Sequence, residues 1–271
     1  MNTIEGVIFD WAGTTVDFGC FAPVSAFMKA FQAAGVEVTV AEARAPMGLL
    51  KKDHIRAMLT MPRVGREWEK QYGRSFQEED IEALYAQFEP LLLGSLAEFT
   101  EPLPGVLQTV DAIRGKGLKI GSTTGYTDNM MAIVTQGAKA KGYEPDCWVS
   151  PDATGCCGRP YPYMIFRNME TLKLSAPWRV VKVGDTAADI QEGLQAGVWS
   201  VGVCTGSSQM GLSRREFELL SDKAPVIEQT RQAFLNYGAH FVLEAVSELP
   251  ALIEHINRLF TAGKRPYDTH D

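Results

Sequence analysis

The feature that most constrains the fold is a short apolar run near the start of the chain that stops at an acid. Val7, Ile8 and Phe9 are followed by Asp10 and then by the turn sequence Trp-Ala-Gly-Thr-Thr. Such a run is typical of a strand that is buried on both faces of a parallel sheet. Ligands bind at the carboxyl edge of these sheets, so we expect Asp10 to lie at a binding site. A strand-end acid alone is weak evidence, because some such acids only cap the next helix.

Beyond residue 105 the sequence alternates between helical and strand patterns. Strands are expected at residues 118–123, 147–149, 179–183 and 199–203, with an edge strand at 240–243. Helices are expected at residues 106–114, 128–140, 162–172, 188–196, 214–220, 226–235 and 249–260. This alternation predicts an α/β fold with a doubly wound parallel (Rossmann-like) sheet.

The segment between the first and second expected strands contains helical patterns only. Helices are expected at residues 22–34, 41–46, 49–59, 64–72 and 77–96. We therefore predict an all-helical cap domain, residues 21–99, inserted into an α/β core domain made of residues 1–20 and 100–271. An insert at this point leaves from the ligand edge of the sheet, so it can cover that edge as a lid.

Composition excludes several classes of protein. The 271 residues are 45% hydrophobic and 22% charged, as in an ordinary globular protein. No apolar run approaches the ~20 residues that span a bilayer, and no signal-peptide pattern is present, so we expect a cytoplasmic protein. The net charge of -7, with no run rich in lysine or arginine, argues against nucleic acid and membranes as partners. The five cysteines, Cys20, Cys147, Cys156, Cys157 and Cys204, form no C-x-x-C pair and are expected to be reduced thiols.

Polar residues follow three of the expected strands. Asp10, Thr124 with Gly125, and Asp185 with Asp189 one helical turn further on all fall at the same predicted sheet edge. Carboxylates that lie close together repel one another, and a hard cation is the simplest way to keep them ionised. Mg²⁺ fits, because it prefers oxygen ligands and commonly uses one or two protein carboxylates. Taken singly, Asp185 and Thr124 are also explained as helix caps.

A set of residues along the chain resembles the haloacid dehalogenase superfamily of phosphoryl-transfer enzymes. The set is D-W-A-G-T-T-V-D at residues 10–17, Thr124, Arg159, and V-G-D-T-A-A-D at residues 183–189. The resemblance implies that Asp10 is the nucleophile, that Thr124 and Arg159 bind phosphate, and that Asp185 is a metal carboxylate. Without it, Arg159 would be interpreted as a solvated loop residue.

Within that superfamily, two segments resemble the phosphonoacetaldehyde hydrolase family. These are D-W-A-G-T-T and M-G-L-L-K-K-D-H at residues 47–54. Most superfamily phosphatases carry a second Asp two residues after the nucleophile, where it protonates a leaving alcohol oxygen, but this chain has Ala12. A reaction with a carbon leaving group does not need that acid. The resemblance also implies a homodimer joined through the cap, for which the apolar stripe of residues 22–31 is a candidate surface, although core packing explains the stripe equally well.

The resemblance aligns Lys51 with the lysine that forms a Schiff base with the aldehyde. The C–P bonding electrons can then leave as an enamine instead of as a carbanion. Lys51 is expected to share a helical face with Met47, which would line the substrate pocket, and with His54, which would move protons. Cys20 and Tyr126 are expected to support the site. From the residues alone, the Lys51-Lys52 pair is better explained as a solvated helix face, and His54 is equally well explained as a helix residue without a chemical role.

The full hypothesis is an enzyme that hydrolyses phosphonoacetaldehyde, a small-molecule substrate. Mg²⁺ would be held by the carboxylates of Asp10 and Asp185 and by the Ala12 carbonyl, and Asp189 would support these ligands. Thr124, Gly125 and Arg159 would bind the phosphonate group. Two alternatives remain: a phosphomonoesterase or phosphomutase of the same superfamily, and a non-catalytic phosphonate sensor. In the loop after Arg159, Tyr161 stands where the family usually has a small residue.

Overall fold

The computed structural model describes residues 3–268 and contains a six-stranded sheet in which every neighbouring pair is parallel. The spatial order is β3-β2-β1-β4-β5-β6. The strands are β1 (Gly6–Phe9), β2 (Lys119–Thr123), β3 (Cys147–Val149), β4 (Val180–Gly184), β5 (Trp199–Val203) and β6 (Phe241–Leu243). The predicted doubly wound parallel sheet is confirmed, and β6 is its predicted edge strand.

The register of the three central strands explains why their ends meet. Strand β1 lies between β2 and β4, and Phe9 is opposite both Ser122 and Val183. All four residues of β1 are buried, as a strand covered on both faces must be. Because parallel strands end at one edge, the residues that follow β1, β2 and β4 lie next to one another there.

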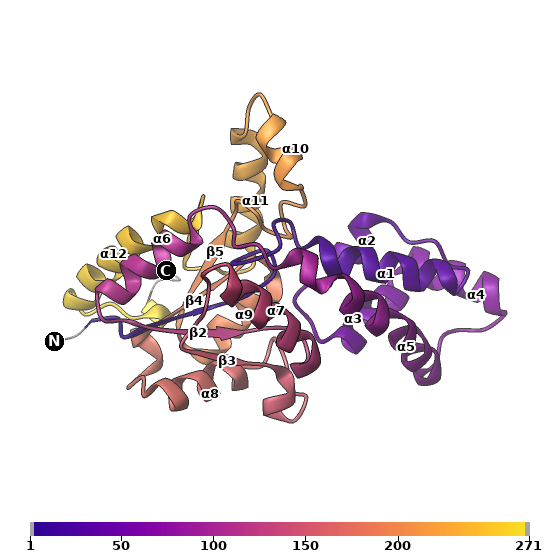
Figure 1. Cartoon of the computed structure of the whole chain (residues 1–271), viewed down its shortest axis with the longest axis horizontal. Helices are drawn as coiled ribbons and strands as arrows, with labels where there is room; N and C mark the ends of the chain where they lie inside the picture. Colours follow the sequence, from indigo (N-terminus) through magenta and orange to yellow (C-terminus); the bar gives the residue numbers. More distant parts are fainter. Residues whose placement is uncertain (1–2, 269–271) are drawn as a thin grey trace.

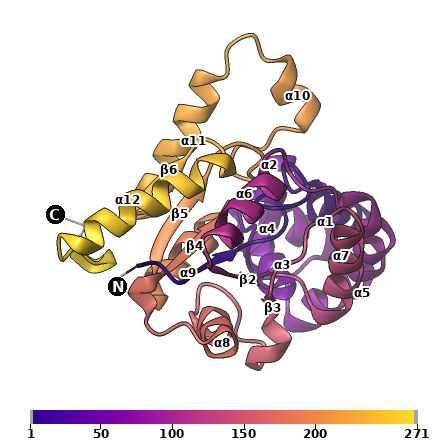
Figure 2. The same ribbon diagram turned by 60° about the vertical axis from the view of Figure 1, so that its left-hand side comes forward.

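Seven helices belong to the core within the described residues. They are α6 (Val106–Gly115), α7 (Asp128–Ala140), α8 (Tyr163–Leu172), α9 (Ala187–Ala196), α10 (Arg214–Leu219), α11 (Ala224–Asn236) and α12 (Leu249–Thr261). Six of them lie against the sheet or its edges, and α10 projects away from it (Figures 1 and 2). Helices α6 and α12 pack together on one face of the sheet, and α8 and α9 pack together on the other. The sheet is therefore the middle layer of a three-layer fold.

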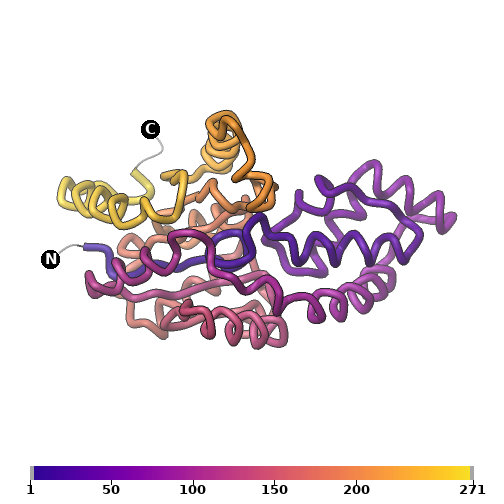
Figure 3. The backbone as a smooth tube through the Cα atoms, turned by 45° about the horizontal axis from the view of Figure 1, so that its top comes forward, coloured from indigo at the N-terminus to yellow at the C-terminus, as the bar shows by residue number. Residues whose placement is uncertain are grey.

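The five remaining α-helices all lie between β1 and β2 in the chain and form a separate helical body beside the carboxyl edge of the sheet (Figures 1 and 3). They are α1 (Phe21–Ala33), α2 (Val40–Arg44), α3 (Lys51–Thr60), α4 (Pro62–Tyr72) and α5 (Glu78–Ser95). Helix α1 packs along α5, and its apolar side chains Val24, Phe27 and Phe31 are buried in that contact layer. The predicted insertion of a helical cap into the α/β fold is confirmed.

The two segments that connect the helical body to the sheet run side by side. Val16 pairs with Pro102 in an antiparallel bridge, and the Leu103 amide donates to the Thr15 carbonyl at 2.9 Å. Asp17 caps α1 by accepting from the amides of Phe21 and Ala22, at 3.0 and 3.1 Å. The helical body is therefore joined to the sheet by two adjacent connecting segments only. Such a narrow connection is the geometry that a lid requires for hinge motion.

Helix α3 begins later than the sequence pattern predicts. Gly48 has φ 92°, and Leu50 has extended backbone angles (φ -50°, ψ 141°), so Lys51 is the first residue of the helix. Met47 therefore lies in the preceding turn. The expectation that Met47 and Lys51 share a helical face is wrong, because the left-handed backbone at Gly48 interrupts the helix.

Candidate active site

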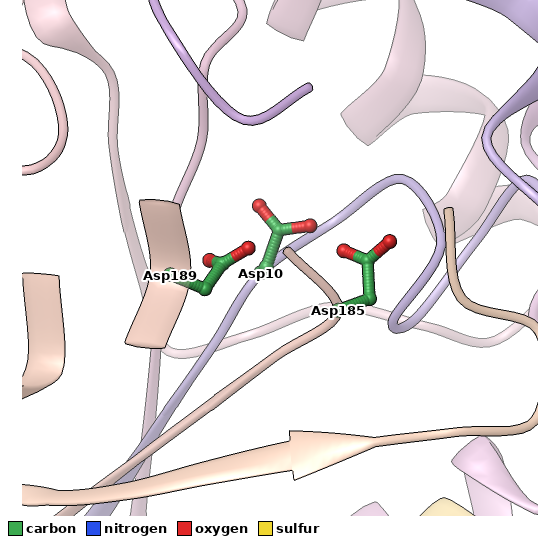
Figure 4. Close-up of side chains that lie close together, drawn as sticks. All are labelled: Asp10, Asp185 and Asp189. Carbon is green, nitrogen blue, oxygen red and sulfur yellow. The ribbon is translucent and has the colours of Figure 1, made fainter. Parts of the chain in front are cut away.

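Three buried carboxylates lie together at the carboxyl edge of the sheet. Asp10 directly follows β1, Asp185 directly follows β4, and Asp189 lies in the first turn of α9. One oxygen from each of the three lies within 4.8 Å of the others, and Figure 4 shows Asp10 between the other two. The Asp10 amide donates to the Val183 carbonyl at 2.9 Å, which fixes the start of the loop to the neighbouring strand.

Asp185 is held by neutral donors and has no cationic partner among the described residues. Its oxygens accept from the Ser208 amide at 2.7 Å and from the Thr14 hydroxyl at 3.1 Å. Burial and the nearby negative charges of Asp10 and Asp189 raise the pKa of Asp185 well above its ordinary value. A Cβ atom at Gly13 would lie 2.1 Å from the Asp185 carboxylate, so only glycine allows this approach.

These groups fit a divalent cation. Asp189 is already compensated, because it pairs with Arg159 at 3.1 Å and with Lys182 at 2.8 Å. Burial raises the pKa of both Asp10 and Asp185, with a further rise from Asp189 for Asp10 and from Asp10 and Asp189 for Asp185, and a hard cation beside these two carboxylates would favour their ionised forms. Ala12 lines the same cavity as Asp10. Asp10 and Asp185 thus belong to the group of carboxylates that could hold an ion, and the ligand set Asp10, Ala12 and Asp185 stays a prediction.

Arg159 reaches Asp10 from the loop before α8. Its Nη2 donates to Asp10 Oδ1 at 2.6 Å and to the Thr123 hydroxyl at 2.9 Å. Its Nε donates to Glu192 at 3.0 Å. The side chain is buried, and the surrounding carboxylates raise its pKa, so the guanidinium stays charged. A buried, charged arginine at this position offers strong hydrogen bonds to a phosphonate or phosphate group.

Thr124 and Gly125 follow β2 and line the same cavity as Asp10 and Arg159. The Thr124 hydroxyl accepts from the Tyr126 amide at 3.0 Å, which orders the turn. A Cβ atom at Gly125 would lie 3.0 Å from the Leu49 carbonyl oxygen and 3.1 Å from that of Gly48. The sheet edge and the loop before α3 are therefore in close contact over the cavity.

Lys51 enters this cavity from the helical body. The residue is 5% exposed, and within residues 3–268 it forms no hydrogen bond or ion pair. Its Nζ lies 4.9 Å from the centre of the Tyr126 ring. Burial, with a smaller effect from Arg159, lowers the pKa of Lys51 to about 8, although Cys20 and Asp10 act in the opposite direction. Lys52, in contrast, is exposed and pairs with Glu82 at 2.6 Å.

The remaining pocket residues come from both parts of the fold. Met47, Cys20 and Tyr126 are all buried and line a small cavity of about 20 Å³ together with Lys51 and Asp10. Burial and neighbouring acids raise the pKa of the Cys20 thiol, so it stays protonated. The Tyr126 hydroxyl is buried without a hydrogen-bond partner in the described part of the chain.

His54 is close to this group but does not line the cavity. Its ring stacks on Phe27, with 3.9 Å between the ring centres, and its Nε2 lies 2.9 Å from the Ala43 carbonyl oxygen. Burial and the charge of Lys51 lower the pKa of His54 well below its ordinary value, so the ring is neutral. A neutral ring that donates from Nε2 leaves Nδ1 as an acceptor, and this atom has no partner among residues 3–268.

Two charged residues of the site were not predicted. Lys182 is in the middle of β4, and Glu192 is one turn after Asp189 on α9; both are fully buried. A lysine flanked by valines in a buried strand was the available signal, because such a residue needs a charged partner. Tyr161 is 54% exposed and stacks on Tyr163 outside the cavity, so it does not shape the pocket.

The arrangement combines a buried carboxylate, an arginine fixed beside it, a candidate metal position and a buried amine of lowered pKa. The first three are the parts that phosphoryl transfer requires. The amine adds a nucleophile suited to carbonyl compounds, since a desolvated lysine is partly neutral near pH 7.

Comparison with known proteins finds relatives in one family of hydrolases. Residues 4–197 match the model of the family described as haloacid dehalogenase-like hydrolase. A phosphonoacetaldehyde hydrolase of Lysinibacillus sphaericus is 55% identical over 256 residues, which are 94% of this chain and 95% of the relative. A phosphonoacetaldehyde hydrolase of Parabacteroides distasonis is 50% identical, covering 95% of this chain and 98% of the relative.

Solved structures agree with the sequence matches. The crystal structure of a phosphonoacetaldehyde hydrolase like protein from Oleispira antarctica superposes with a TM-score of 0.94 at 39% identity, covering 98% of this chain and 96% of that one. A β-phosphoglucomutase from Clostridium difficile superposes with a TM-score of 0.69 at 18% identity, covering 96% of this chain and 100% of that one. The second similarity shows the shared fold only.

Proposed function

Because the chain belongs to the haloacid dehalogenase-like hydrolases and, within them, to the phosphonoacetaldehyde hydrolase family, we propose that it hydrolyses the carbon–phosphorus bond of phosphonoacetaldehyde to acetaldehyde and phosphate. The observation that carries the proposal is the position of Lys51, whose amine is buried in the cavity that also contains Asp10. A desolvated amine next to the nucleophile suits imine formation with an aldehyde, a step that hydrolysis of a phosphate ester does not require.

In the first step the neutral amine of Lys51 adds to the aldehyde carbon. Loss of water gives a protonated imine, which is positively charged two bonds from the carbon that carries phosphorus. When the C–P bond breaks, its electron pair moves toward the iminium nitrogen and gives a neutral enamine. The pKa of about 8 supports this step, because about one amine in ten is then neutral at pH 7.

In the second step the carboxylate of Asp10 attacks phosphorus in line with the breaking bond, and an aspartyl phosphate forms. Arg159 and Thr124 would bind the phosphonate oxygens, and Gly125 would keep the backbone close to them. Bound Mg²⁺, held by Asp10, Asp185 and the Ala12 carbonyl, would neutralise charge on the transferred group. Water then releases phosphate from Asp10, and protonation and hydrolysis of the enamine release acetaldehyde from Lys51.

Charge balance supports the metal. Asp10, Asp185, Asp189 and Glu192 form one buried group with the two cations Arg159 and Lys182. Two negative charges are left over in this group, which equals the charge of one divalent cation. Without that cation, the excess would be relieved only by protonation of a carboxylate.

His54, Met47, Cys20 and Tyr126 are proposed to assist the lysine. His54 lies one helical turn from Lys51 and has a free Nδ1, which suits a relay of protons during imine formation and enamine protonation. Met47, Cys20 and Tyr126 surround the amine with weakly polar groups, so water has little room beside it. Asp189 is proposed to support the site through Arg159.

We propose residues 21–99 as the cap domain and residues 1–20 with 100–271 as the core domain. Within residues 3–268, no helix has both the length and the hydrophobicity needed to cross a bilayer. We propose a cytoplasmic enzyme and a homodimer joined through the cap. The apolar stripe of residues 22–31 is buried within the single chain, so the dimer must use other cap residues. Sedimentation velocity tests the dimer.

Borohydride reduction tests the reaction. Wild-type enzyme treated with phosphonoacetaldehyde and borohydride is expected to carry a covalent adduct on Lys51, found by peptide mass spectrometry. Lys51→Arg is the matched control and should give no adduct and no phosphate release. Asp10→Ala should still form the adduct but release no phosphate. A phosphomonoesterase or a phosphonate sensor would give no adduct at all, and undiminished phosphate release from Lys51→Arg would refute the role of the lysine.

A further inference from the structure

Behind the proposed phosphonate site lies a buried charge network that contains two residues with no assigned role, Lys182 and Glu192. Lys182 Nζ lies 2.8 Å from Asp189 and 3.3 Å from Glu192, and it donates to the Thr123 hydroxyl at 2.9 Å. The Thr123 hydroxyl in turn donates to Glu192 at 2.9 Å. All four side chains are fully buried. Burying several charged side chains together costs free energy, so each of them must have a partner of opposite charge.

The network fixes Arg159 on three sides. Glu192 accepts from Nε at 3.0 Å, Asp189 pairs with Nη2 at 3.1 Å, and the Thr123 hydroxyl accepts from Nη2 at 2.9 Å. The contacts of Glu192 and Asp189 lie on the side of the guanidinium that faces α9. The same Nη2 also donates to Asp10 at 2.6 Å, and Arg159 and Asp10 both line the cavity.

Lys182 determines how much of the Arg159 charge is available to a ligand. Asp189 and Glu192 together carry two negative charges, and Lys182 supplies one of the two positive charges that offset them. If Lys182 were neutral, both carboxylates would be compensated by Arg159 alone. Arg159, Asp189 and Glu192 would then carry one net negative charge together, which opposes the binding of an anion beside Asp10.

We propose that Lys182 and Glu192 are positioning residues: Glu192 orients Arg159, and Lys182 offsets the carboxylates around it, so that Arg159 can bind the phosphonate or phosphate group. The inference rests on the proposed function only in assigning Arg159 to the anion. The inference adds to the residues of the cavity wall a second, buried layer of functional residues from β4 and α9.

The network predicts opposite effects on anion and cation binding. Lys182→Met removes a positive charge, so the Mg²⁺-loaded protein should bind inorganic phosphate about tenfold more weakly or worse. The same change makes the carboxylate group more negative, so the metal-free protein should bind Mg²⁺ more tightly. Loss of structure would weaken the binding of both phosphate and Mg²⁺. It cannot make the binding of one of them tighter.

Isothermal titration calorimetry measures both affinities without any turnover. Wild type, Lys182→Met, Glu192→Gln and the double variant are titrated with Mg²⁺ and, when Mg²⁺-loaded, with inorganic phosphate. Glu192→Gln should weaken Mg²⁺ binding, and the double variant, in which the net charge is restored, should bind Mg²⁺ more nearly as the wild type does. Lys119→Met, an exposed lysine on β2, is the matched control and should change neither affinity.

Two results would overturn the inference. One is Lys182→Met protein with wild-type affinity for both ligands, and the other is a parallel loss of both affinities in a folded protein. If Lys182→Met does not fold, Lys182→Arg decides: it keeps the charge, so an intact phosphate affinity supports the inference and a tenfold loss contradicts it. Phosphate binding involves no imine, so failure here is distinct from failure of the borohydride test.

Discussion

Lys51 Nζ lies 4.9 Å from the centre of the Tyr126 ring, and this contact links the helical cap to the sheet edge. Two effects on the amine oppose each other there. Burial favours the neutral amine and lowers the pKa of Lys51 to about 8. The face of an aromatic ring favours the ammonium ion, by ~0.5–2 kcal/mol. We therefore expect the ring to oppose a further fall of the Lys51 pKa, and the two predictions that follow depend on this balance.

The rate of imine formation should rise with pH through about 8. The pKa of Lys51 is lowered, and the reactive form is the deprotonated one, so activity is low below this pH and reaches a plateau above it. The pH dependence of kcat/KM reports this free-enzyme pKa. A profile that is flat between pH 6 and 9 would contradict the assignment of the lysine.

Replacing Tyr126 with leucine should shift that profile to lower pH. Leucine removes the ring face that stabilises the ammonium ion, and ~0.5–2 kcal/mol corresponds to about 0.4–1.5 pH units. Tyr126→Phe keeps the ring and serves as the matched control, with no expected shift. An upward shift in Tyr126→Leu would mean that water enters the enlarged pocket and that solvation outweighs the ring.

Gly125→Ala should impair closure of the cap over the sheet edge. The added Cβ atom would lie 3.0 Å from the Leu49 carbonyl oxygen, so the loop before α3 must move by a few tenths of an ångström. Because Lys51 follows that loop, we expect kcat/KM to fall about tenfold. Gly94→Ala is the control, since nothing lies within 4 Å of the new atom, and it should keep full activity. Equal kcat/KM values for both variants would show that the contact does not control closure.

Asp185→Asn should separate stability from activity. In metal-free protein the change removes a buried negative charge next to Asp10, and an amide can still accept from Ser208 and donate to Thr14. The unfolding temperature in chelator should therefore rise, by about 2 °C or more per kcal/mol gained. Mg²⁺ at 100 times its Kd should stabilise wild type by about 2.7 kcal/mol and the variant hardly at all. Turnover should be lost.

Scanning calorimetry with and without Mg²⁺ provides this measurement. Asp111→Asn, an exposed acid on α6, is the control and should respond to Mg²⁺ as wild type does. A variant that is less stable than wild type in chelator would mean that the Asp185 carboxylate is not repelled in the metal-free protein.

The parts of the site that follow strands were predictable from sequence, because the signal is local. Asp10, Thr124 and Asp185 each come directly after the last residue of a short strand. Parallel strands bring their carboxyl ends to one edge of the sheet. Lys51 was assigned through its resemblance to a family. The residues alone did not distinguish it from Lys52, because the start of α3 depends on the left-handed turn at Gly48.

The rest depended on contacts between distant parts of the chain. Lys182 and Glu192 are ten residues apart, but their partners Arg159 and Thr123 come from two other segments, so no spacing rule connects them. The apolar stripe of α1 gave no sign of whether α5 or a second chain covers it. The structure shows that α5 does.

His54→Phe tests the proposed proton relay from within the cap. Phenylalanine keeps the stacking on Phe27 and the volume of the ring, but it removes the free Nδ1 and the hydrogen bond to Ala43. We expect kcat to fall about 100-fold, since general acid–base groups contribute ~10²–10⁴-fold. The lost hydrogen bond should lower the free energy of unfolding by only ~1–2 kcal/mol, so the variant folds.

Single-turnover experiments locate the affected step in this variant. The borohydride adduct on Lys51 should still form, but more slowly, while phosphate binding to the Mg²⁺-loaded protein stays unchanged, because His54 does not line the cavity that contains Arg159. His255→Gln, an exposed histidine on α12, is the control for loss of an imidazole. A kcat within twofold of wild type would show that His54 only packs against α1, and protons would then have to reach the imine through the pocket itself.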